Sequence, residues 1–394
     1  MSSGNRSVAF LHHLRWLAAV AVAVSHIRQN LIAGNEQEAH HGILTAVVFS
    51  VSDFGGAAVM VFFVLSGFLV GGKAMDLFQS SSVAREWPHF LIDRFSRTFV
   101  VLWPALVLAG GAVLFLRVIA PDAPFMTSAH WGPALYRPIN GDISVQSWLG
   151  AAALVNGLAS PMLQINGPLW SLAFEWFYYI AALALILGIR GVSSTGAVAI
   201  MVYAVILLGL GLIFNSDMIV WTLVWIMGVA SRFVFDRGVL RGSWLKIGSL
   251  AVLVIVLVEN HLDHGVSNLL IGLATAFVIA NRDWASWKMG AFWGEKLAGF
   301  SYSFYLTHFP ITVVILGLLY RCGITAQRLP LNGVSLAIML LTLASAVAAA
   351  RLFALVTEDR TRVVRNFLLR RFKLDTPRPG AFPSDHQGYA VRSE

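Results

Sequence analysis

The chain has 394 residues, of which 57% are hydrophobic and only 12% are charged. A soluble domain has about 25% charged residues, so this composition predicts a polytopic membrane protein. The formal net charge of +8 does not indicate nucleic-acid binding, because the basic residues fall in loops between apolar runs. Cys322 is the only cysteine, which excludes an intramolecular disulfide and a cysteine-based metal site.

Apolar runs long enough to cross a bilayer recur along the chain. Runs of about 17–25 residues predict an all-α integral membrane fold with about ten transmembrane helices. Their expected ranges are 10–32, 55–72, 98–119, 168–189, 195–214, 217–235, 244–260, 266–281, 298–320 and 332–356. A competing interpretation takes residues 17–24 as a signal-peptide core with a cleavage site at 23–25. The many later spans favour a retained first helix.

The basic residues predict the orientation of these helices. They concentrate in the loops on the N-terminal side of the membrane, so both termini are expected in the cytoplasm. Residues 1–357 are expected to form the transmembrane domain. Residues 358–394 are expected to form a basic, partly disordered cytoplasmic tail, which begins as a helix. The long outer loop at 120–167 is expected to hold a short interfacial helix near 146–158. The absence of organelle signals favours a bacterial inner membrane.

The first span carries two ionisable residues, Arg15 and His26. A helix turns about 100° per residue, so their separation of about three turns places both on one face, roughly 16 Å apart along the axis. A charge at bilayer depth is unfavourable by about 2.5–3.5 kcal/mol and usually marks a functional site. The structural alternative is an arginine that extends to the headgroups and a histidine at a helix end.

An arginine pair follows the second span, in the segment PHFLIDRFSRTFVVLWP, which is expected to begin in a cytoplasmic loop. Arg94 and Arg97 are three positions apart and adjacent on a helical face. Two guanidinium groups can bind a phosphate-bearing ligand bidentately. On spacing alone, ordinary positive-inside anchors are the favoured explanation of the pair.

The fourth span begins with NGPLWSLAFEWFYY. Ser171 and Glu175 are four positions apart, and Tyr178 and Tyr179 continue a polar stripe. A glutamate expected near the outer leaflet could select acceptor hydroxyls or act as an acid or base. Alternatively, it is a water-exposed carboxylate at a helix N-terminus.

The ninth span contains SYSFYLTHFP. Ser301, Tyr305 and His308 share a helical face, and Pro310 frees the carbonyl group of Leu306. A kinked, polar segment at membrane depth is typical of ligand sites. A histidine that only packs is the alternative.

Other clusters predict less. Glycines 67, 71 and 72 indicate close helix packing. Glu259, His261, Asp263 and His264 lack the spacing of a metal site, as do His12-His13 and His40-His41, so no metal is expected.

These stretches together resemble acyltransferase family 3 of integral membrane proteins. The matching segments are Arg15 with ten residues before His26, FFVLSGFLV at 62–70, DRFSR at 93–97, NGPLWSLAFEWFYY at 166–179 and SYSFYLTHFP at 301–310. The resemblance implies transfer of an acyl group, most simply acetyl, from cytoplasmic acyl-CoA to a hydroxyl group of a surface carbohydrate or glycolipid. The implied partners are the bilayer and this acceptor, and not nucleic acid.

The resemblance also implies the roles of individual residues. His26, Arg15 and Glu175 would be catalytic, and Arg15, Arg94 and Arg97 would bind the donor. The acceptor would contact the remaining group, which is Ser171, Tyr178, Ser301, Tyr305 and His308. Many family members have proline where this chain has Val100. Many also carry a soluble hydrolase-like domain not seen here, which implies action alone, as a homo-oligomer or with a separate partner.

The mechanism and two alternative classes stay open at this level. His26 would act as a general base on the acceptor hydroxyl, or would form an acyl-histidine intermediate. A membrane-bound O-acyltransferase of another fold should not keep the Arg15–His26 spacing. A transporter should show inverted repeats or paired broken helices, and the sequence shows neither.

Overall fold

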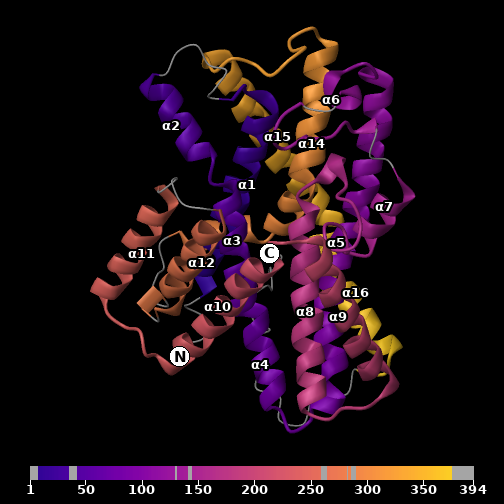
Figure 1. Ribbon diagram of the computed structural model, residues 1–394, viewed down its shortest axis with the longest axis vertical. Coiled ribbons are helices and arrows are strands. Elements are labelled where there is room, and N and C mark those ends of the chain that lie inside the picture. Colours follow the sequence, from indigo (N-terminus) through magenta and orange to yellow (C-terminus); the bar gives the residue numbers. More distant parts are fainter. Residues whose placement is uncertain are drawn as a thin grey trace, which may run out of the picture.

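The computed structural model describes residues 8–34, 42–128, 131–140, 144–258, 264–281, 283–284 and 290–374. Within these ranges the chain is helical, with isolated β-bridges and no strand (Figure 1). The helices are α1 (Val8–Leu31), α2 (Ile43–Ser52), α3 (Gly55–Ser66), α4 (Gly72–Gln79), α5 (Val83–Ile119), α6 (Pro124–Thr127), α7 (Val145–Ala152), α8 (Leu169–Ile189), α9 (Thr195–Phe214), α10 (Met218–Arg237), α11 (Ser243–Val258), α12 (His264–Ala280), α13 (Ala291–Ala298), α14 (Ser301–Arg321), α15 (Gly333–Val356) and α16 (Thr361–Arg371). A π-helical turn, η3 (Gly67–Gly71), joins α3 to α4.

Helices of membrane-spanning length dominate the described chain. Eight are long and apolar enough to cross a bilayer. The two remaining expected spans, α11 and α12, form shorter apolar helices of 16 and 17 residues. They lie with α10 at one side of the bundle (Figure 1). The all-helical membrane fold is therefore confirmed, and eight of the ten expected spans reach spanning length.

The first part of α5, with Arg94 and Arg97, and helix α16 form one end of the bundle, which we call the basic end. Helix α16 lies in the lower half of Figure 1. This end is more helical than the expected loop. Helix α5 begins at Val83, so the segment with Arg94 and Arg97 is helical and not a loop. Helix α16 packs on this extension, where Arg365 pairs with Asp93 and His89 contacts the Leu374 carbonyl at 2.7 Å. The described part of the expected tail is thus a packed helix, because it covers α5 and its Arg365 neutralises Asp93. Residues 375–394 lie outside the described ranges.

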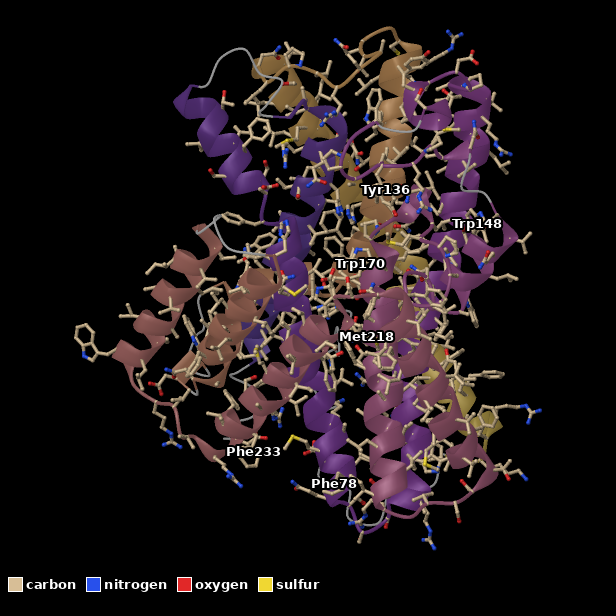
Figure 2. The ribbon with its side chains drawn as sticks, viewed as in Figure 1. Phe78, Tyr136, Trp148, Trp170, Met218 and Phe233 are labelled. Atoms are coloured by element: carbon tan, nitrogen blue, oxygen red, sulfur yellow. The ribbon has the colours of Figure 1, made fainter. Side chains whose placement is uncertain are left out.

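Close backbone contact holds the centre together. A Cβ on Gly67 would overlap the carbonyl oxygen of Trp225, and one on Gly228 would overlap that of Val64. The predicted glycine packing is therefore confirmed between α3–η3 and α10. Aromatic rings fill the adjoining space. Trp170 of α8, which is labelled in Figure 2, lies 4.5 Å from Trp221 and 6.3 Å from Phe63 between ring centroids.

Candidate active site

Helix α1 carries Arg15 and His26 in one unbroken run of 24 residues. Both side chains face α14. His26 contacts His308 of α14, and Arg15 pairs with Glu358, whose carboxylate also accepts the Ser303 N–H of α14. The prediction that Arg15 and His26 share a face is confirmed, because regular α-helical spacing is kept between them.

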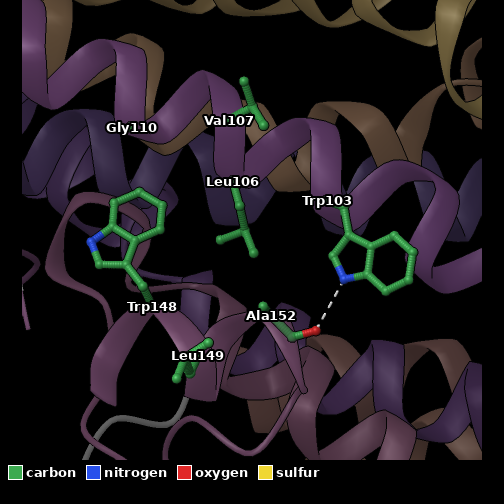
Figure 3. A pocket seen from close by; sticks show the side chains of 7 residues that line it. All are labelled: Trp103, Leu106, Val107, Gly110, Trp148, Leu149 and Ala152. Carbon is green, nitrogen blue, oxygen red and sulfur yellow. Dashed lines mark hydrogen bonds between the residues drawn. The ribbon is translucent and has the colours of Figure 1, made fainter. Parts of the chain in front are cut away.

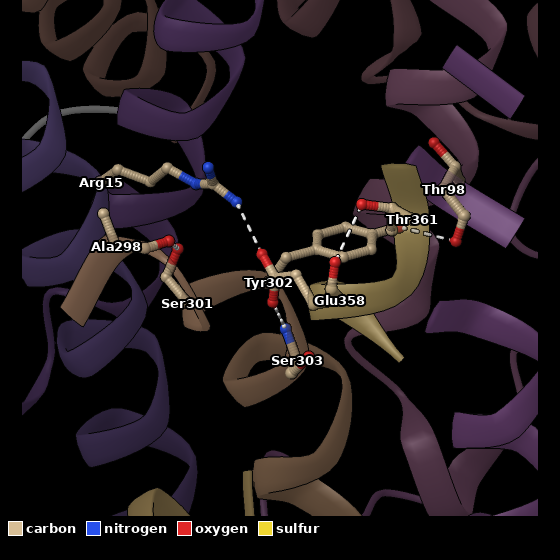
Figure 4. A network of polar contacts seen from close by, with 8 residues as sticks. All are labelled: Arg15, Thr98, Ala298, Ser301, Tyr302, Ser303, Glu358 and Thr361. Atoms are coloured by element: carbon tan, nitrogen blue, oxygen red, sulfur yellow. Dashed lines mark hydrogen bonds and ion pairs between the residues drawn. The ribbon is translucent and has the colours of Figure 1, made fainter. Parts of the chain in front are cut away.

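Glu358 is a site residue that the sequence analysis missed. One carboxylate oxygen accepts the main-chain N–H of Ser303 at 2.9 Å, in the first turn of α14. The other lies 3.7 Å from the Arg15 guanidinium (Figure 4). That separation is an ion pair but too long for a hydrogen bond. Since α15 ends at Val356, the acidic pair Glu358 and Asp359, two residues after an apolar span, was the available signal.

The predicted arginine pair joins Arg15. Arg15 interacts electrostatically with Arg97, and Arg94 lies over the ring of Tyr179 at 6.0 Å. The Nε of Arg94 is buried and has no hydrogen-bond partner in the described part of the protein. Three guanidinium groups held in one region, one with an unused donor, are suited to a ligand that carries several negative charges.

Glu175 lies beside these arginines. Its carboxylate accepts a hydrogen bond from Tyr179 and interacts electrostatically with Arg15 and Arg94. A second interaction reaches Tyr305, so Glu175 lies between the arginines and the polar face of α14. The predicted catalytic role of Glu175 stays a prediction.

Tyr178 is not in this polar group. Its ring packs against Phe63 and Trp225, with centroids at 5.7 and 5.4 Å, and only 2% of the residue is exposed. Tyr179, four positions after Glu175, stays within about 40° of it on the helix, whereas Tyr178 is displaced by about 60° to the other side. Tyr178 therefore belongs to the apolar core, and none of these contacts supports its predicted role in substrate binding.

The deeper part of the site is a histidine pair. Nδ1 of His26 lies 3.0 Å from Nε2 of His308. The rings are parallel within 4°, with centroids 5.3 Å apart, and the edge of Phe309 closes one side. His308 is fully buried, whereas His26 is partly exposed. His26 is thus the member of the pair that a substrate can reach.

A second contact links α8 to α14. The hydroxyl groups of Ser171 and Tyr305 are 2.6 Å apart, and both lie within hydrogen-bond distance of the Pro168 carbonyl, at 3.1 and 3.2 Å. Each hydroxyl carries one proton, so one of them donates to the carbonyl and the other donates to its partner hydroxyl. The structure therefore brings together two residues that were predicted to contact the acyl acceptor. The Ser301 hydroxyl instead donates to the Ala298 carbonyl at 2.9 Å, across the break between α13 and α14.

An apolar groove of about 520 Å³ lies elsewhere, between α5 and α7 (Figure 3). The Trp103 indole donates to the Ala152 carbonyl at 3.1 Å across it. None of the predicted site residues lines this groove, and Trp103 and Val107 are 48% and 76% exposed. Its position and lining match a lipid-facing surface and not the site of chemistry.

Metal ligands do not gather within the described residues, where no three His, Cys, Asp or Glu side chains form a candidate metal site. Residues 40–41 and 259–263, which include most of the clusters weighed in the sequence, lie outside the described ranges.

Comparison with known proteins identifies the family. Residues 8–351 match the acyltransferase family 3 model, described as an acyltransferase domain. The chain is also 29% identical over 168 residues to the acyltransferase MdmB of Streptomyces mycarofaciens, a match that covers 42% of this chain and 36% of that protein. No solved structure matches the chain. The arginines and the histidine pair lie in a membrane-type helical bundle, and the chain belongs to acyltransferase family 3.

Proposed function

We propose that the protein transfers an acyl group, most simply acetyl, from acyl-CoA to a hydroxyl group of a surface carbohydrate or glycolipid. The observation that carries this proposal is the arrangement on α1. Arg15, with the other arginines around it, lies about three helical turns from His26 on the same face. One end of the site thus suits a polyanion, and the other end offers a base.

The donor would bind at the basic end. Arg15, Arg94 and Arg97 can hold the phosphate groups of coenzyme A through charge-assisted hydrogen bonds. The pantetheine arm is long and flexible, so the thioester can extend along the face of α1 toward His26. We propose the cytoplasm as the side of donor entry, because the positive-inside rule favours the cytoplasm for basic loops.

The chemistry would take place at His26. Its free ring nitrogen accepts the proton of the acceptor hydroxyl as the oxygen bonds to the thioester carbonyl carbon. The carbon–sulfur bond then breaks, and the proton passes from His26 to the coenzyme A thiolate. Ser171, Tyr305 and Glu175 would orient the acceptor. An acyl-histidine intermediate remains the second route, and ping-pong kinetics would reveal it.

Transfer of labelled acetyl from acetyl-CoA into membrane material tests this proposal. We expect incorporation by the intact protein and its loss in His26→Ala at matched expression. His264→Ala is the control, because His264 is an exposed residue at the start of α12. Equal incorporation by the intact protein and His26→Ala would exclude the role of His26. If label is absent in both but enters from a longer acyl-CoA, the donor class stands and acetyl is wrong.

A further inference from the structure

His308 contacts main-chain carbonyl oxygens through one of its ring nitrogens. Nδ1 of His308 lies 2.8 Å from the Tyr305 oxygen and 3.2 Å from the Phe304 oxygen. A carbonyl oxygen can only accept, so this nitrogen must carry a proton. In neutral His308, Nε2 is therefore unprotonated and acts as an acceptor.

The tautomer of His308 determines the tautomer of His26. Its Nε2 lies 3.0 Å from Nδ1 of His26, and a hydrogen bond there needs the proton on Nδ1 of His26. Neutral His26 carries one ring proton, so its Nε2 has a free lone pair. Among the described residues, no group hydrogen-bonds to that nitrogen.

We infer that His308 is a positioning residue that fixes His26 in the Nδ1–H tautomer and makes Nε2 of His26 the atom that takes the acceptor proton. When that transfer occurs, His26 becomes an imidazolium whose Nδ1–H donates a charge-assisted hydrogen bond to His308. An aspartate does the equivalent in serine proteases, by holding the tautomer and stabilising the imidazolium. A neutral histidine does so here without burying a second charge in the membrane.

The kinetic consequence of this inference rests on the proposed function. The tautomer of His26 rests only on the hydrogen-bond geometry. Solid-state NMR of protein with ¹³C,¹⁵N-labelled histidine, in lipid bilayers, measures the tautomer directly; His26→Ala identifies the His26 resonances. We expect a protonated Nδ1 and an unprotonated Nε2 in the intact protein, and a loss of this preference in His308→Leu. A protonated Nε2 in the intact protein would overturn the inference, whether or not acyl transfer is detected.

Kinetics test the consequence. His308→Leu removes the nitrogen that accepts the hydrogen bond from His26. We expect this variant to lower kcat about 100-fold and to leave the KM for the acyl donor unchanged. His308→Gln should have a kcat at least about tenfold above that of His308→Leu, because the amide oxygen of glutamine can accept a hydrogen bond from His26. Phe309→Leu is the matched control, since Phe309 also packs on His26 at 5.4 Å but has no acceptor. Equal losses in His308→Leu, His308→Gln and Phe309→Leu would show a packing role and contradict the inference.

Discussion

The side-chain amide of Asn166 donates a hydrogen bond of 2.9 Å to the main-chain carbonyl of Leu306. Pro310 cannot supply the N–H that this carbonyl would receive in a regular helix. Asn166 is fully buried, just before α8. Two segments that matched the family separately, NGP and SYSFYLTHFP, are therefore joined in space, next to the turn that carries His308.

Replacing Asn166 with leucine tests this contact. The variant leaves the Leu306 carbonyl buried without a donor, and we expect it to lower the free energy of unfolding by about 1–3 kcal/mol. Thermal unfolding in detergent measures the loss. Asn140→Leu is the control, because the Asn140 side chain accepts only an exposed hydrogen bond from Arg117. Equal stabilities of the two variants would contradict the account.

The ion pair between Arg15 and Glu358 predicts a change in donor binding. Glu358→Gln keeps an oxygen for the Ser303 N–H but loses the charge that attracts Arg15. We expect the KM for acyl-CoA to rise about fivefold with kcat little changed, since a partly exposed ion pair contributes up to about 1 kcal/mol. Steady-state kinetics with varied donor concentration measures the effect.

The neighbouring residue supplies the control for Glu358. Asp359→Asn removes an exposed ion pair of 3.0 Å with Arg351, so the donor KM should not change. A lower KM in Glu358→Gln would mean that Glu358 competes with the donor for Arg15. An equal change of the donor KM in Glu358→Gln and Asp359→Asn would show that only the net charge of the region matters.

The arginine pair predicts a second effect on the donor. We expect Arg94→Ala and Arg97→Ala each to raise the donor KM about 10- to 100-fold, as loss of charge-assisted hydrogen bonds worth about 1.5–3 kcal/mol requires. Arg85→Ala is the control on the same helix, since Arg85 is exposed near its start. If Arg85→Ala raises the donor KM as much as the other two variants, the arginines are general membrane anchors and do not bind the donor.

The contact between Gly67 and α10 predicts a stability effect. Gly67→Ala places a methyl group on the main chain around Trp225 and Gly228, and overpacking of this kind is unfavourable by about 1–3 kcal/mol. Gly209→Ala meets no atom within 4 Å, so it should leave the melting temperature unchanged or raise it. A melting temperature for Gly67→Ala as high as that of Gly209→Ala would contradict this packing.

Local patterns predicted the helices and much of the site. Helical periodicity alone gave the shared face of Arg15 and His26, and the proline rule gave the free Leu306 carbonyl. The partners of these groups come from distant segments, so no spacing rule identifies them. His308 reaches His26 across 282 positions, and Asn166 reaches Leu306 across 140. Tyr178 and Tyr179 look alike in the sequence, and only the neighbouring helices show that Tyr178 packs in the core and Tyr179 bonds to Glu175.

The most direct test of the account measures the side from which the donor acts. Labelled acetyl-CoA is added to sealed membrane vesicles with the cytoplasmic face outward, and separately to right-side-out vesicles. We expect incorporation only with the cytoplasmic face outward, its loss in His26→Ala, and a higher donor concentration for half-maximal incorporation in Arg94→Ala. Incorporation only from the opposite face, or incorporation that His26→Ala does not change, would contradict it.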